Sequence, residues 1–151
     1  METREDITII KARKHDLEVV VKVASLLFDD AEKSELTSEY EHLFENRECA
    51  VFLAMRDNEP IGFAQCQLRH DYVEGTHTSP VGYLEGIYVL EDYRCHDIAS
   101  DLLDVCEKWA YVMGCREFAS DAEIENNGSI VFHLKRGFVE VNRIVCFKKE
   151  I

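Results

Sequence analysis

The sequence is short of basic residues and of proline. Its 17 lysines and arginines are outnumbered by 30 aspartates and glutamates, for a formal net charge of −13, and only two prolines occur in 151 residues. Such a surface repels nucleic acid phosphates and anionic membranes, so neither is expected as a partner, and it attracts cations. An acidic surface that serves solubility alone is the simpler alternative. No repeat, low-complexity stretch or linker interrupts the chain, and its length fits one domain over residues 1–151.

Paired cysteine motifs and long apolar runs are also missing. The six cysteines include no C-x-x-C pair and no zinc-type spacing to a histidine, so no metal site is expected. The even count would allow three disulfides, but several cysteines sit in apolar runs, as reduced core cysteines do. We therefore expect free thiols and a cytoplasmic protein. No apolar run approaches the length of a membrane span, and the first six residues do not resemble a signal peptide.

Apolar periodicity predicts an α/β protein. Strands are expected over residues 7–12, 49–55, 61–69, 81–90 and 115–120, with a turn at 57–60 and two closing strands within 138–148. Helices are expected over residues 17–28 with Asp16 as a cap, 38–44 with a capping box at Ser38, 98–113 and 129–136. The alternation of strands and helices in the second half indicates a mixed sheet with parallel pairing there.

The strand at residues 81–90 and the segment after it carry the main chemical signal. Gly82 and Gly86 interrupt an apolar strand, as at a β-bulge, and Glu85 lies beside the interruption. An outward-facing strand position is the structural alternative for Glu85. A polar turn then leads into the helix at Ile98, whose free N–H groups suit a pyrophosphate. Taken alone this signal is weak, because any strand–turn–helix unit has such an end.

Two motifs in the second half resemble those of the GCN5-related N-acetyltransferases (GNAT). Residues 83–99 resemble the acetyl-CoA-binding motif of that superfamily, a strand followed by Arg-x-x-Gly-x-Ala and a helix; here residues 94–99 are Arg-Cys-His-Asp-Ile-Ala. Residues 126–138 resemble its second motif, with Asn126, Ser129 and His133 ahead of Gly-Phe. The resemblance implies the GNAT fold: a mixed central sheet flanked by helices, with strands splayed at the bulge.

A closer resemblance is to the aminoglycoside 6′-N-acetyltransferases of that superfamily. The first 60 residues match only in pattern, and the matching segments that follow are residues 69–73, 79–81, 84–87, 114–117, 119–121 and 125–126. The resemblance implies direct acetyl transfer from acetyl-CoA to the 6′-amine of an aminoglycoside, which confers antibiotic resistance. It also implies a homodimer, with no metal and no covalent enzyme intermediate.

By that resemblance the site residues fall into two groups. Acetyl-CoA would bind along the strand, the turn after it and the second motif, at Ile87, Tyr88, Val89, Arg94, Cys95, His96, Asp97, Ile98, Ala99 and Asn126. The aminoglycoside would contact Phe28, Tyr72, Glu85, Asp121 and Asn142. Structural alternatives stay open for four of these residues: core packing for Phe28, a loop aromatic for Tyr72, a turn or helix cap for Asp121 and a solvated turn for Arg94.

Two residues are expected to move protons. Glu85 would hold the acceptor ammonium and take its proton, directly or through water, since only the neutral amine attacks a thioester. His133 stands where many family members have a tyrosine that protonates the leaving thiolate, and a histidine can do the same. A purely structural hydrogen bond is the alternative for His133. A backbone N–H near Tyr88 or Val89 would stabilise the oxyanion.

Asp97 departs from the family pattern, which has glycine at that position. A carboxylate adds bulk and like charge where a pyrophosphate would bind, unless its side chain points away and caps the helix. Two rival functions stay open. One is acetylation of another amine, such as a polyamine or a protein N-terminus. The other is a non-catalytic acyl-CoA- or cation-binding module that has lost cofactor affinity at Asp97.

Overall fold

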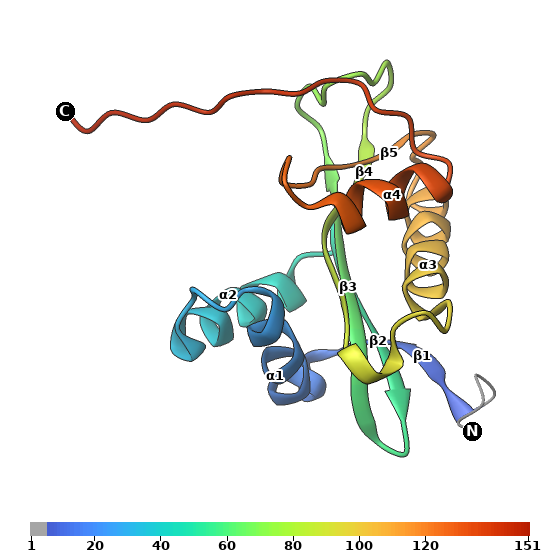
Figure 1. Cartoon of the computed structure of the whole chain (residues 1–151). Coiled ribbons are helices and arrows are strands. Elements are labelled where there is room, and N and C mark those ends of the chain that lie inside the picture. The colour runs from blue at the N-terminus through green and yellow to red at the C-terminus, as the bar shows by residue number, and fades with distance from the viewer. Residues whose placement is uncertain (1–5) are drawn as a thin grey trace.

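The computed structural model describes residues 6–151 and builds them around one sheet with helices on both faces (Figure 1). Within these residues the sheet has five strands in the order β1-β2-β3-β4-β5. They are β1 (Thr8–Lys11), β2 (Cys49–Arg56), β3 (Glu59–Arg69), β4 (Val81–Val89) and β5 (Phe118–Ser120). The first three pairings are antiparallel, and β4 pairs with β5 in parallel. The predicted mixed sheet, with parallel pairing in the second half, is confirmed.

The helices form a layer on each side of the sheet. α1 (Leu17–Leu27) and α2 (Lys33–Glu45) cover one face, and α3 (Ile98–Val112) covers the other (Figure 1). α4 (Asn127–Lys135) follows β5, and the 3₁₀ turns η2 (Lys14–Asp16) and η3 (Glu91–Tyr93) lead into α1 and toward α3. Within residues 6–151, no helix combines the length and apolar character needed to cross a bilayer.

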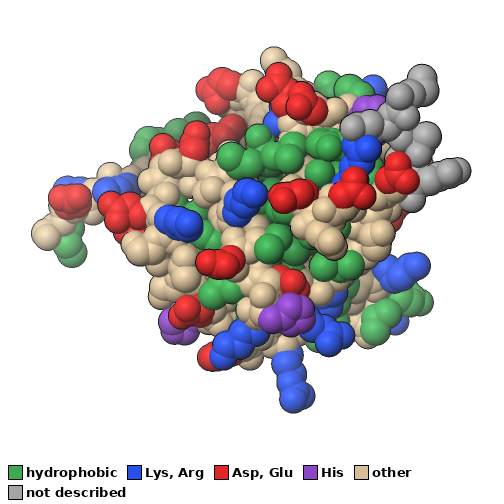
Figure 2. Space-filling view, turned by 90° about the horizontal axis from the view of Figure 1, so that it is seen from below, with side chains coloured by type: hydrophobic (Ala, Val, Ile, Leu, Met, Phe, Trp, Pro, Cys, Tyr) green, Lys and Arg blue, Asp and Glu red, His purple; other side chains and the backbone are tan. Residues whose placement is uncertain are grey.

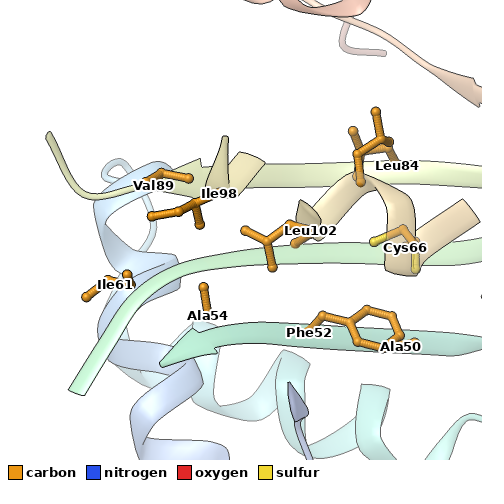
Figure 3. Packing of buried hydrophobic residues seen from close by; sticks show 12 residues of the cluster. Ala50, Phe52, Ala54, Ile61, Cys66, Leu84, Val89, Ile98 and Leu102 are labelled. Carbon is orange, nitrogen blue, oxygen red and sulfur yellow. The ribbon is translucent and has the colours of Figure 1, made fainter. Parts of the chain in front are cut away.

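Each face of the sheet carries its own apolar layer because side chains alternate along a strand. On β2, Phe52 faces α3, whereas its neighbour Leu53 packs with α1 and α2. Figure 3 shows the α3 layer, in which Ile98 and Leu102 lie over the sheet near Cys66. The two layers fix the position of β4, which lies between α1 on one side and α3 on the other.

The turn predicted at residues 57–60 joins β2 to β3. Asp57 and Asn58 both have positive φ angles, 49° and 65°. This is the conformation of a two-residue hairpin turn, and Asp and Asn adopt it more readily than most residues. The strand resumes at Glu59, two residues earlier than the sequence predicted.

The predicted start of α2 is wrong, whereas α1 begins at Leu17 as predicted. α2 begins at Lys33 with Glu32 at its N-cap, so the predicted capping box at Ser38 lies inside the helix. The earlier start buries Leu36 beside Tyr40, four residues on, and so supplies the apolar contact that the short predicted helix lacked. Asp16 is the N-cap residue of α1, but its carboxylate accepts a hydrogen bond from the backbone N–H of Arg13 (2.9 Å) instead of one from α1.

The two closing strands predicted within residues 138–148 are also wrong. Residues 138–151, here called the C-terminal arm, form no strand. The arm first passes the loop between β3 and β4, where Val141 lies close to Gly75, and its end then extends away from the rest of the fold (Figure 1). The arm exposes large apolar side chains: Val139, Val141, Ile144, Val145, Phe147 and Ile151. A strand needs a partner for its backbone groups, and the arm does not pair with β5, the last strand of the sheet.

Candidate active site

The bulge predicted in β4 lies at Glu85. Along the β3–β4 ladder, Gln65 pairs with Gly86 and the next residue, Cys66, pairs with Leu84. Glu85 is therefore an extra residue on β4. Such a residue bends its strand and redirects the side chains beside it.

β4 and β5 separate at the same point. They pair only over Gly82–Leu84 and Phe118–Ser120, whereas β4 continues to Val89. From Glu85 onward, β4 has no neighbouring strand on its β5 side within residues 6–151. The splayed strands expected from the sequence are confirmed, and they leave a row of backbone groups open.

The open backbone groups belong to alternate residues of β4. The amide of Leu90 donates to the carbonyl of Ile61 on β3 at 2.8 Å. Backbone groups alternate sides along an antiparallel pair, so the amide of Tyr88 also faces β3. The amides of Ile87 and Val89 then face the side that β5 does not reach. Of the two oxyanion donors expected from sequence, the geometry favours Val89 over Tyr88, and it adds Ile87.

A tight polar turn joins the open end of β4 to α3. Asp97, the N-cap residue of α3, has a left-handed φ of 63°, and Cys95 has a φ of 68°. Glycine adopts this region without steric cost, which explains why the motif that this turn resembles has glycine at the position of Asp97. The Asp97 side chain accepts no hydrogen bond from the helix N-terminus, so the predicted capping alternative is not realised.

Arg94 is exposed, but its side chain lies against the end of β4. Its Nε donates to the carbonyl of Val89 at 2.9 Å, and its guanidinium carbon lies 5.2 Å from the centre of the Tyr88 ring. This places a positive charge between the open backbone of β4 and the N-terminus of α3. Both features attract an anion.

Four side chains from three strands form a connected set beside the bulge, here called the Glu85 network. It consists of Arg69, the last residue of β3, Tyr83 and Glu85 on β4, and Asp121 directly after β5. Arg69 donates from Nε and Nη2 to one oxygen of Glu85, Oε1, at 3.1 and 2.8 Å. Its guanidinium carbon lies 3.4 Å from the centre of the Tyr83 ring, and the Tyr83 hydroxyl donates to Asp121 Oδ2.

The electrostatics of the network keep Tyr83 protonated. Burial, and then the hydrogen bond to Asp121, raise the pKa of Tyr83 above its usual range. The phenol therefore stays a hydrogen-bond donor at any physiological pH and holds the Asp121 carboxylate in place. The two carboxylates expected to bind a cationic acceptor are thus brought together through Arg69 and Tyr83.

Phe28 and Tyr72, the two aromatic residues expected on the acceptor side, lie on different elements. Phe28 ends α1, packs edge-on against Phe63 and closes on the bulge, since a Cβ at Gly86 would lie 3.2 Å from Phe28 Cζ. Phe28 therefore packs in the core and also lies beside the bulge at Glu85. Tyr72 lies on the loop between β3 and β4 and is 76% exposed, which leaves its ring available to a ligand.

His133 reaches the splay through a hydroxyl group. Its Nδ1 lies 2.7 Å from the carbonyl oxygen of Ser129, which can only accept, so Nδ1 carries a proton. Its Nε2 lies 2.8 Å from the Oγ of Ser120, the last residue of β5. The ring packs edge-on against Phe138. The structural hydrogen bond considered for His133 exists, and it connects the ring to the strand end where β4 and β5 part.

The two predicted asparagines lie apart from each other. Asn126 caps α4, because its side-chain oxygen accepts from the amide of Ser129 at 3.1 Å. Asn142 lies in the exposed C-terminal arm, where its side-chain oxygen accepts from the amide of Arg143 at 2.8 Å. Within residues 6–151, Asn142 makes no hydrogen bond with Glu85.

The excess of negative charge is not uniform over the surface. On the face seen in Figure 2, acidic and basic side chains alternate with apolar ones. At the Glu85 network, Glu85 is paired with Arg69, and Asp121 accepts a hydrogen bond from Tyr83. Within residues 6–151, no group of three or more histidine, cysteine, aspartate or glutamate side chains is arranged to hold a metal ion.

Splayed strands, a bulge and a helix N-terminus next to the splay match a known family. The sequence model of the acetyltransferase (GNAT) family matches residues 20–138. The chain belongs to the GNAT family.

Several members of the GNAT family resemble this chain along most of its length. An aminoglycoside N(6′)-acetyltransferase type 1 of Acinetobacter genomosp. 13 is 43% identical over 127 residues, covering 83% of this chain and 86% of that protein. The enzyme of the same name from Salmonella typhimurium is 41% identical over 109 residues, 72% of this chain and 75% of that protein.

Solved structures agree with this assignment. The aminoglycoside N-acetyltransferase AAC(6′)-Iy in complex with CoA superposes with a TM-score of 0.92 at 34% identity, covering 96% of this chain and 95% of that one. AAC(6′)-Ih from Acinetobacter baumannii gives a TM-score of 0.88 at 38% identity, with 96% of this chain and 99% of that chain covered.

The sequence assigned no role to three side chains of the candidate site: Arg69, Tyr83 and Ser120. Tyr83 lies two residues before Glu85, a spacing that puts both on one face of a strand. The alternation of side chains along the strand could therefore have predicted that Tyr83 lies beside Glu85. Arg69 and Ser120 join the site only through pairing between strands distant in sequence, which periodicity does not report.

Proposed function

We propose that this GNAT protein transfers the acetyl group of acetyl-CoA directly to the 6′-amine of aminoglycoside antibiotics. The observation that carries the proposal is the bulge at Glu85, which sets an acceptor carboxylate next to the open amides of Ile87 and Val89. A binding site for the acceptor amine and backbone amides that can bind the acetyl thioester thus share one opening. The names of the similar proteins support the choice of acceptor.

The residues between β4 and α3 fit a CoA thioester. The open amides of Ile87 and Val89 suit the polar groups of an extended arm, while Arg94 and the N-terminus of α3 suit a pyrophosphate. Tyr88, Cys95, His96, Asp97, Ile98, Ala99 and Asn126 complete the proposed cofactor side. Acetyl-CoA supplies the activated acyl group, and the amides facing the opening stabilise negative charge on its carbonyl oxygen.

The Glu85 network fits a polycationic amine. Glu85 and Asp121 attract ammonium groups, and Phe28 and Tyr72 offer ring faces to a sugar. The 6′-ammonium must lose a proton before it can attack, and Glu85 orients it and receives that proton through water. Asn142 belongs to this group only if the C-terminal arm of a second copy brings it there.

His133 supplies the proton that the leaving group needs. When the ring is protonated, Nε2 donates to the Ser120 hydroxyl, and that hydroxyl in turn donates to the thiolate. The Ser129 carbonyl accepts from Nδ1 and fixes the ring orientation for this transfer.

Turnover against a panel of amines tests the proposal. Purified protein and acetyl-CoA are mixed with kanamycin, with spermidine or with a short peptide that has a free N-terminus, and products are followed by mass spectrometry. Mass detection is needed because the exposed thiols of Cys95 and Cys146 would react with a thiol reagent. We expect acetylation of kanamycin. Turnover of only spermidine or the peptide contradicts the acceptor, and absence of acetyl-CoA binding by calorimetry favours a non-catalytic module.

We further propose that the protein acts as a homodimer of single-domain chains in the cytoplasm, where acetyl-CoA is available. The C-terminal arm exposes Val145 and Phe147, and β5, at the end of the sheet, has an edge to which a strand can add. Addition of the arm to a second copy would bury these apolar side chains. Light scattering should give a dimer mass for the full chain and a monomer mass for a chain ending at Phe138. A monomer mass for the full chain contradicts the dimer.

A further inference from the structure

A cation already occupies the carboxylate that the proposed acceptor needs. Both donated hydrogen bonds from Arg69 go to Oε1 of Glu85. The second oxygen, Oε2, accepts no hydrogen bond from the described residues. The two side chains are 37% and 21% exposed, so a ligand can reach the pair.

Contacts with its neighbours hold the Arg69 side chain in this position. Its guanidinium group stacks on Tyr83, which is buried, and the Tyr83 hydroxyl is tied to Asp121. A stacked arginine with two hydrogen bonds to one carboxylate oxygen gives up several contacts if it leaves. Its positive charge is therefore a permanent part of the acceptor side.

That charge has a chemical consequence for an amine acceptor. Carboxylates alone would hold the acceptor best as an ammonium ion, which cannot attack a thioester. A guanidinium group nearby raises the free energy of the ammonium form relative to the neutral amine.

We propose that Arg69 is a positioning residue for acetyl transfer, one that presents Oε2 of Glu85 to the acceptor and favours the neutral, reactive amine. The proposal rests on the amine-acetylating function proposed above. It predicts a division of effects: without Arg69, cations bind more tightly but react more slowly.

Other ionisable groups near Arg69 and Glu85 could also change the pH dependence of turnover, and their effects must be distinguished from that of Arg69. They are Tyr83 on β4, Asp121 after β5, Cys49 and Glu48 at the start of β2, and His70, whose Nε2 lies 2.6 Å from Glu48. Burial raises the pKa of both Tyr83 and Cys49, so neither loses its proton in a neutral assay. Histidine changes charge near neutral pH, so His70 needs its own control.

The test compares Arg69→Gln with Arg69→Lys, using kanamycin and acetyl-CoA between about pH 5.5 and 9. In Arg69→Gln we expect a severalfold lower KM for kanamycin and a severalfold lower kcat at neutral pH. The acidic limb of the kcat profile should move up by about 0.5–1 pH unit, because loss of a positive charge favours the protonated amine. Arg69→Lys keeps the charge and should keep the limb in place.

Two matched variants serve as controls. Arg116 also stacks on a tyrosine, with its guanidinium carbon 4.4 Å from the centre of the Tyr111 ring, so Arg116→Gln removes a similar contact away from the network. Arg116→Gln and His70→Gln should both leave the acidic limb where the unaltered protein has it.

Two results would overturn the proposal. One is an unmoved acidic limb in Arg69→Gln; the other is a raised KM, which would show that Arg69 serves only to order the site. Thermal melts check that each variant is folded. If the unaltered protein acetylates no 6′-amino aminoglycoside, the proposed function fails separately, and the same variants are compared on the amine that it does accept.

Discussion

Replacing Asp97 tests whether the turn before α3 binds a pyrophosphate. The residue is exposed, has a φ of 63° and stands directly before the first turn of the helix. Like charges separated by about 5 Å repel by about 1–3 kcal/mol for an effective dielectric constant between about 20 and 80. Exposure and salt place the effect near the lower end, and about 1 kcal/mol corresponds to about fivefold in Kd.

Two substitutions separate charge from backbone geometry. Asp97→Asn removes the charge, and asparagine tolerates the left-handed region nearly as well as aspartate. Asp97→Gly also removes the Cβ atom. We expect both to lower the Kd for acetyl-CoA about fivefold at low salt, with a smaller gain at physiological salt. In Asp97→Gly, relief of the left-handed strain raises Tm and the greater freedom of the unfolded chain lowers it, so these two backbone effects should largely cancel.

Calorimetric titration of acetyl-CoA measures these effects, with Asp104→Asn as the control. Asp104 is exposed on α3 seven residues further on, about 10 Å along the helix axis, where its charge is largely screened. An unchanged Kd in both Asp97 variants would refute the reasoning and show that the carboxylate does not face the pyrophosphate. A gain in Asp97→Gly alone would assign the effect to the backbone.

Three further predictions concern the acceptor side and the stability of the fold. Glu85→Gln and Asp121→Asn should each lower kcat/KM for kanamycin by the equivalent of about 1.5–3 kcal/mol of transition-state stabilisation, and the Kd for acetyl-CoA should stay unchanged. Glu48→Gln breaks an exposed ion pair, so its effect on kcat/KM should be smaller. Hydrogen bonds from the Thr78 hydroxyl and the amides of His77 and Thr78 lower the pKa of Glu117 below 4.5. The Glu117 carboxylate therefore stabilises the fold above pH 4.5, and this contribution is lost as pH falls through the lowered pKa. Glu117→Gln should flatten the fall of Tm on the acid side. A Cβ at Gly82 would lie 2.6 Å from Ala110 Cβ, so Gly82→Ala should lower the free energy of unfolding by about 1–3 kcal/mol, measured by denaturant titration.

Local signals in the sequence were enough to predict the centre of the fold. The interrupted strand around Glu85 and Gly86 predicted the bulge, and the ladder register confirms it. Glycines after periodic segments predicted the ends of α3 and α4, where Gly114 and Gly137 have positive φ. These features depend on a few neighbouring residues, so a single sequence can report them.

Features that depend on distant partners were not predicted. Arg69 and Ser120 join the site through contacts with residues 16 and 13 positions away. The prediction of two closing strands was wrong for a related reason. Residues within 138–148 have the alternation of a strand, but pairing also requires an edge within reach, and the arm does not pair within its own chain.

The position of the transferred acetyl group tests the central claim most directly. The purified protein is incubated with acetyl-CoA and kanamycin, and the product is examined by NMR, beside an otherwise matched aminoglycoside that has a hydroxyl group at the 6′ position. We expect a single acetyl group on the 6′-nitrogen of kanamycin and no comparable product from the 6′-hydroxyl compound. Acetylation at another amine, or no product from any 6′-amino aminoglycoside while a different amine is turned over, would contradict it.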